Sequence, residues 1–132
     1  MFNTPTEAQL ASIPGLYQTD HIITKDKIIH AHFYIGQSHW FIAEYDHVDT
    51  MFGFCVLNGD LEMAEWGYVS FQELKNINVL GLYQVQYDVY WTPKPAGQVD
   101  LIRHGGGIYF DTDSTPDMEP LDLVFPQPLT LP

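Results

Sequence analysis

The chain has 132 residues, 45% of them apolar, and a formal net charge of −12. This length suits one domain, and the apolar content is sufficient for a packed core, so wholesale disorder is excluded. The excess of 17 acidic over 5 basic residues argues against direct binding to nucleic acid or to an anionic membrane, because like charges repel. One cysteine cannot form an internal disulfide, and no apolar run indicates a membrane span or secretion signal, so we expect a cytoplasmic location.

The first half of the chain predicts a short helix followed by a run of strands. A Thr-x-x-Glu capping pattern starts the helix at Thr4, and Pro14-Gly15 ends it. Apolar, β-branched and aromatic runs then predict four strands, and Asn58-Gly59 is a strong hairpin signal between the last two. We place these strands at residues 27–35, 39–46, 50–57 and 61–69.

The second half predicts another helix, more strands and an extended arm. Ser70 caps the helix, which ends before Gly81, and a long strand follows at 83–91. Short apolar runs at 99–103 and 108–110 flank three glycines and predict a hairpin. We therefore expect an α+β domain at 1–110, with a mostly antiparallel sheet of five to seven strands and two short helices on one face. An acidic, proline-rich arm is expected at 111–132.

Several motifs in the first 95 residues resemble a known family. They include Pro14-Gly15-Leu16-Tyr17, the segment from Trp40 to Asp46, the segment from Glu65 to Leu74, and Asp88 to Pro95. In order and spacing they resemble small proteins catalogued only as a domain of unknown function. The resemblance implies an accessory protein of a plasmid, integrative element or phage, acting inside a bacterial host cell, often among genes that counter host defence. It implies no active site, and it ends near residue 96.

The acidic residues are the first candidate for a functional surface. No Lys or Arg lies between Lys27 and Lys75, whereas seven acids do. Paired spacings along strands and turns predict a surface patch that binds a partner. Its members are Glu44, Asp46, Asp49, Asp60, Glu62 and Glu65. The plain alternative is a solvated surface that keeps the protein soluble.

Dense carboxylates repel one another unless a cationic partner neutralises them. With the resemblance, this predicts a non-enzymatic inhibitor that imitates nucleic acid. Its partner would be a basic nucleic-acid-binding protein or nuclease complex of the host, of restriction or CRISPR type. The prediction requires the six carboxylates to form one continuous patch.

Histidines and aromatic residues support two alternatives. His30 and His32, two apart on a strand, can present imidazoles to one metal ion, which would make the protein a small metal-dependent enzyme. No Cys pair or His-Glu-x-x-His motif accompanies them, so no cofactor is expected. The abundant aromatic residues, or the C-terminal arm, would instead suit a protein–protein adaptor. Cys55 lies in an apolar strand, which is typical of an inert buried thiol.

Overall fold

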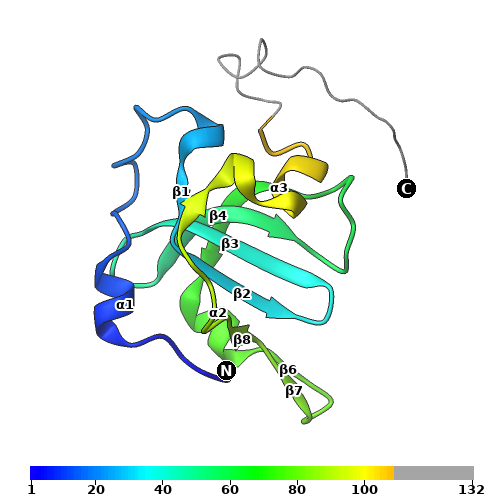
Figure 1. Ribbon diagram of the computed structural model, residues 1–132. Coiled ribbons are helices and arrows are strands. Elements are labelled where there is room, and N and C mark those ends of the chain that lie inside the picture. Colours follow the sequence, from blue (N-terminus) through cyan, green and yellow to red (C-terminus); the bar gives the residue numbers. More distant parts are fainter. Residues whose placement is uncertain (109–132) are drawn as a thin grey trace.

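The computed structural model describes residues 1–108, and the arm predicted at 111–132 lies outside these residues. A central antiparallel sheet has the strand order β5-β4-β3-β2-β8, and short helices flank it (Figure 1). Its strands are β2 (Ala31–Ile35), β3 (Ser38–Tyr45), β4 (Thr50–Val56), β5 (Glu65–Ser70) and β8 (Gln86–Tyr87). The α+β class with an antiparallel sheet is therefore confirmed.

Two small strand pairs and five short helices complete the described fold. The pairs join β1 (Ile28–Ile29) to β9 (Lys94–Pro95), and β6 (Asn78–Val79) to β7 (Tyr83–Gln84). The α-helices are α1 (Glu7–Ala11), α2 (Phe71–Asn76) and α3 (Asp100–His104). The 3-10 helices are η1 (Thr24–Asp26) and η2 (Ala96–Gln98). No helix within residues 1–108 is long and apolar enough to cross a membrane.

The central strands of the sheet are buried on both faces. Successive side chains of a strand point to opposite faces, and in β3 Trp40 belongs to one core cluster whereas Phe41 belongs to the other. Phe71 and Leu74 of α2, with residues around α1, cover the first face. The second face is covered by η2 and α3, which contributes the fully buried Ile102. The two predicted helices share a face as expected, and the third helix was not predicted.

A β-bulge interrupts the pairing of β3 with β4. Ile42 pairs with Gly53 and Glu44 pairs with Phe52, so Ala43 is the extra residue. The strands approach so closely here that a Cβ on Gly53 would lie 2.0 Å from the carbonyl oxygen of Phe41. After the bulge, Tyr45 joins the cluster to which Ile42 belongs. Glu44 therefore points to the opposite face from the one that simple alternation predicts.

The predicted strand at 83–91 is wrong beyond residue 87. Val85 and Tyr87 are buried, but Asp88 turns the chain by accepting a hydrogen bond from the Tyr90 N–H at 3.0 Å. Val89 is consequently exposed rather than aligned with the buried residues. Strand β5 is also shorter than predicted, because residues 61–64 lie in the connection that precedes it.

The hairpin predicted around the three glycines is also wrong. Residues 100–104 form α3, which buries Ile102 against the sheet. The glycines allow close packing instead of a strand turn: a Cβ on Gly107 would lie 2.7 Å from the Phe54 ring. At the other end of the chain, the cap of α1 is Thr6, whose side chain accepts from the Gln9 N–H, and not Thr4.

Candidate functional site

Glu44, predicted as a surface carboxylate, is buried, with 3% of its surface exposed. It accepts hydrogen bonds from the backbone N–H of Tyr17 at 2.9 Å, from the N–H of Thr19 at 3.1 Å, and from the Thr19 hydroxyl. Lys27 in turn donates to the Thr19 Oγ1 at 3.0 Å. The prediction of a partner contact at Glu44 is corrected: this carboxylate has its hydrogen-bond partners inside the protein.

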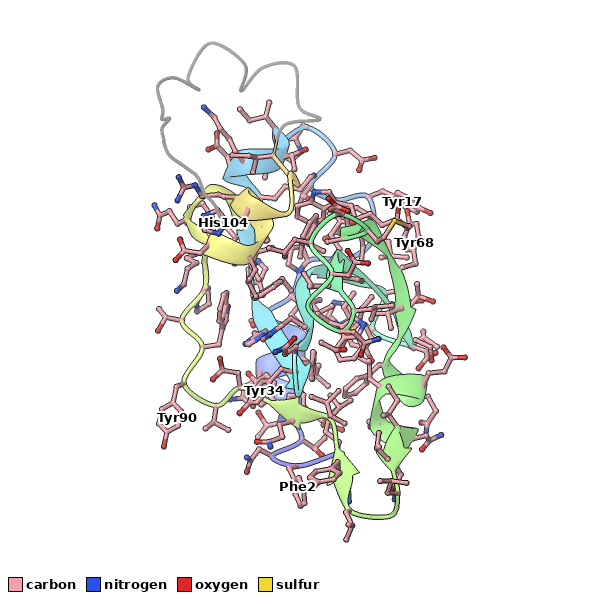
Figure 2. The ribbon with its side chains drawn as sticks, turned by 90° about the vertical axis from the view of Figure 1, so that its right-hand side faces the viewer. Phe2, Tyr17, Tyr34, Tyr68, Tyr90 and His104 are labelled. Atoms are coloured by element: carbon pink, nitrogen blue, oxygen red, sulfur yellow. The ribbon has the colours of Figure 1, made fainter. Side chains whose placement is uncertain are left out.

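The loop that Glu44 holds contains a strained residue. Tyr17 has a φ of +68°, a left-handed conformation that is unfavourable for a bulky side chain, and its side chain is largely exposed. It lies beside Tyr68 of β5, as Figure 2 shows. The pKa of Tyr68 is raised, and the hydrogen bond with Tyr17 is the largest cause. The buried carboxylate thus stabilises a loop that places an aromatic side chain in solvent.

Asp46 and Asp49 organise the turn between β3 and β4. The Oδ1 of Asp46 accepts from the backbone N–H groups of Val48, Asp49 and Thr50 at 2.7 to 2.9 Å. These bonds lower the pKa of Asp46, and the bond from the Asp49 N–H has the largest effect. Asp49 accepts from the Ser70 hydroxyl and from the Gln72 N–H, so it helps to cap α2. Both carboxylates therefore have structural roles and remain only partly exposed.

Asp60, Glu62 and Glu65 lie together at the connection between β4 and β5 and are exposed. Asp60 accepts from the backbone N–H of Glu62 at 3.1 Å. Beside them is an open recess of about 260 Å³. Its lining residues are Cys55, Leu57, Asn58, Asp60, Met63 and Glu65. Burial, and then Glu65, raise the pKa of the Cys55 thiol to about 11.

The six predicted carboxylates do not form one patch. Asp46 and Asp49 precede β4, whereas Asp60 and Glu62 follow it, and Figure 1 shows these two turns at opposite ends of the strand. A strand of seven residues spans roughly 23 Å, which separates the two groups by about that distance. With Glu44 buried, only Asp60, Glu62 and Glu65 remain as a local group of exposed acids.

The hydrogen-bond partners of the predicted histidines differ from the arrangement that a shared metal ion requires. His32 bonds through Nδ1 to Asp88 at 2.9 Å and through Nε2 to the Nδ1 of His39 at 2.9 Å. His30 lies between β1 and β2, and within residues 1–108 its side chain takes no part in this chain of bonds. Those residues contain no group of three or more His, Cys, Asp or Glu that could hold a metal ion.

Burial lowers the pKa of His30, His32 and His39. For His32 the hydrogen bond and charge of Asp88 oppose this shift without reversing it. His32 is 9% exposed, and its ring lies 4.7 Å from the Phe41 ring, centre to centre, in nearly parallel stacking. Asp88, His32 and His39 therefore form a connected polar group, which we call the histidine relay, in a mostly aromatic environment.

Exposed apolar side chains gather on the hairpin formed by β6 and β7. Leu80 is 82% exposed and Leu82 is 70% exposed, and Val79 and Tyr83 are also exposed. The hairpin projects from the body near the N-terminus (Figure 1). Phe2 and Tyr90, both exposed, lie toward the same end of the molecule (Figure 2). This apolar surface bears no charged side chain between residues 78 and 84.

Sequence reasoning missed Asp88, Tyr17 and Leu80 as candidates. Asp88 lies within the strand predicted at 83–91, although aspartate is also a common turn residue. Leu80 precedes Gly81 where an Asn-Gly turn would be expected, and this was the available signal. Tyr17 carried no local signal, because its strain depends on a glutamate 27 residues away.

The chain belongs to the family described as protein of unknown function (DUF2958), whose model matches residues 10–99. This confirms the resemblance to a domain of unknown function. Neither the curated proteins nor the solved structures include a significant match. The family carries no established activity, and the mobile-element setting remains a prediction.

Proposed function

We propose that this protein acts without catalysis by binding another protein, and that the β6–β7 hairpin docks into an apolar groove of that partner. One observation carries the proposal: Leu80 combines 82% exposure with a φ of +58°. An exposed leucine gains nothing from burial in the free protein. It also costs roughly 1–2 kcal/mol in the left-handed conformation.

The conformation of the turn makes leucine an unfavourable residue at position 80. Leu80 and Gly81 both have positive φ, and the Leu82 N–H donates to the Val79 carbonyl at 3.0 Å. Asparagine is favoured over leucine at such a turn position. Exposed apolar groups that reduce stability are typical of binding surfaces, where a few buried anchors supply most of the affinity.

The test replaces Leu80 by asparagine and uses Val48→Asn as the matched control. Val48 is 83% exposed and lies in the turn between β3 and β4, outside the hairpin. Leu80→Asn should stabilise the free protein by about 0.5–1 kcal/mol while it removes the anchor. Val48→Asn should leave binding unchanged.

Binding is measured by photo-crosslinking in the cells that encode the chain, with benzoylphenylalanine at position 82. A discrete adduct should form in the otherwise unchanged protein and in Val48→Asn, and should be lost in Leu80→Asn. An adduct that is equally abundant in Leu80→Asn would refute docking by the hairpin. So would the absence of an adduct.

A second candidate function retains the basic partner that the excess of acidic residues predicts. Nucleic-acid mimicry now has only Asp60, Glu62 and Glu65 to support it, rather than six carboxylates. The recess beside them combines the carboxylates of Asp60 and Glu65 with exposed Leu57 and Met63. Carboxylates above an apolar floor suit a lysine or arginine side chain with an aliphatic stem. A crosslinker at position 57 should then give an adduct that disappears at high salt, whereas the hairpin adduct should persist.

A further inference from the structure

The histidine relay lies on the face of the sheet that α3 covers only in part. His32 comes from β2 and His39 from β3, where His39 pairs with Tyr34. Asp88 is held in place by two bonds: its N–H donates to the His32 carbonyl at 2.9 Å, and its Oδ1 accepts from the Tyr90 N–H. The relay therefore joins three segments of the chain through groups in defined positions.

The hydrogen bonds of the relay determine which ring nitrogens of His32 and His39 carry a hydrogen. An ionised Asp88 can only accept, so the Nδ1 of His32 carries a hydrogen and donates it. In neutral His32 the Nε2 is then an acceptor, and the hydrogen of this second bond must come from the Nδ1 of His39. Neutral His39 is left with a free electron pair on Nε2. The lowered pKa of both histidines supports this neutral arrangement.

The relay can accept one further proton without losing a bond. A proton added to the Nε2 of His39 leaves both existing hydrogen bonds intact. A proton added to the Nε2 of His32 would place two N–H groups against each other. The Nε2 of His39 is therefore the ring nitrogen of the relay that remains able to accept a hydrogen bond. The charged and titratable neighbours of the relay are Lys94, which acts on His32, and Tyr34, which lies beside both rings.

His39 also lines a recess of about 180 Å³. Its other lining residues are Gln37, Val56, Gly59, Leu61 and Leu101, so the walls are mainly apolar. The His39 ring stacks nearly parallel to Phe41, with the ring centres 5.8 Å apart. A mainly apolar recess lined by one imidazole and the Gln37 amide suits a molecule that has an apolar body and one hydrogen-bond donor.

We infer that this recess is a binding site for a small neutral molecule with an apolar body and a hydroxyl group, whose hydroxyl donates to the Nε2 of His39. The chain's net charge of −12 disfavours an anionic ligand. The site is separate from the β6–β7 hairpin, and its ligand does not depend on the proposed protein partner.

The first test determines the tautomers by nitrogen-15 NMR of the full chain at pH 7.5. Both His32 and His39 should carry their hydrogen on Nδ1. A His39 with its hydrogen on Nε2 would overturn the inference, because that atom could then only donate.

The second test compares p-cresol with 4-methylanisole, which has the same ring and no hydroxyl hydrogen. p-Cresol should bind at least about fivefold more tightly, since one hydrogen bond contributes about 1 kcal/mol. His39→Phe keeps the ring stacking and should abolish this difference. Equal affinity for the two molecules, or no binding of either, would overturn the inference.

The preference should also depend on pH. Protonation converts the Nε2 of His39 into a donor, so the preference for p-cresol should be lost as the pH falls through the pKa of His39. That pKa lies below its usual value of 6.5, so the preference should be complete at pH 7.5. A preference that is unchanged down to pH 4 would contradict the role of His39.

Discussion

Replacing Glu44 by glutamine should destabilise the protein far more than the same change at an exposed glutamate. Glu44 accepts three hydrogen bonds at 3% exposure. Glutamine has one acceptor oxygen instead of two, and its NH₂ group would face N–H donors. Hydrogen bonds to charged groups contribute about 1.5–3 kcal/mol each, so losing one and weakening the others should cost about 2–3 kcal/mol.

The assay is urea unfolding at pH 7, followed by tryptophan fluorescence. For a domain of this size an m-value of about 1.5 kcal/mol/M converts the loss into a decrease of about 1.5 M in the midpoint. Glu65→Gln is the matched control: Glu65 lies on β5 and is exposed, so its midpoint should move by less than about 0.3 M. Equal midpoints for the two variants would refute the structural role of Glu44.

Two further predictions concern the sheet. Gly53→Ala should destabilise the protein by about 2 kcal/mol or more, because its Cβ would lie 2.0 Å from the Phe41 carbonyl oxygen. Gly67 is the paired position in β5, and a Cβ there meets nothing within 4 Å. Gly67→Ala should therefore be neutral or stabilising. Similar urea midpoints for these two variants would contradict the close approach at the bulge. The Cys55 thiol, with a pKa of about 11, should react slowly with iodoacetamide at pH 8 and faster as the pH approaches 11; rapid alkylation of the native protein at pH 7 would contradict its burial.

Much of the fold could be predicted because its signals are local. Ser70 caps α2 as predicted, accepting from the Glu73 N–H at 3.1 Å. The hairpin of β2 and β3, and strand β4, lie close to their predicted positions because apolar side chains recur at strand spacing. The errors at 88–91 and 99–103 have a different cause. There, a side-chain bond of Asp88 and the packing of Ile102 on the sheet outweighed weak strand propensity.

The candidate sites were harder to predict, since they depend on contacts between distant residues. Sequence alone selected His32 and paired it with His30, two positions away. The structure pairs it with Asp88, 56 residues away, and with His39 across the β2–β3 hairpin. Spacing along one strand identifies residues on one face but does not say which neighbouring strand supplies their partners.

The sequence by itself determined the β2–β3 hairpin, strand β4, helix α2 and the excess of acidic charge, because hydrophobic periodicity, capping and composition are properties of short segments. Tertiary structure alone decided how the acids are used. The extra residue in β3 turns Glu44 toward the loop at Tyr17, and the length of β4 separates the other carboxylates. A bulge depends on how two strands fit together, and neither strand's own residue pattern specifies it.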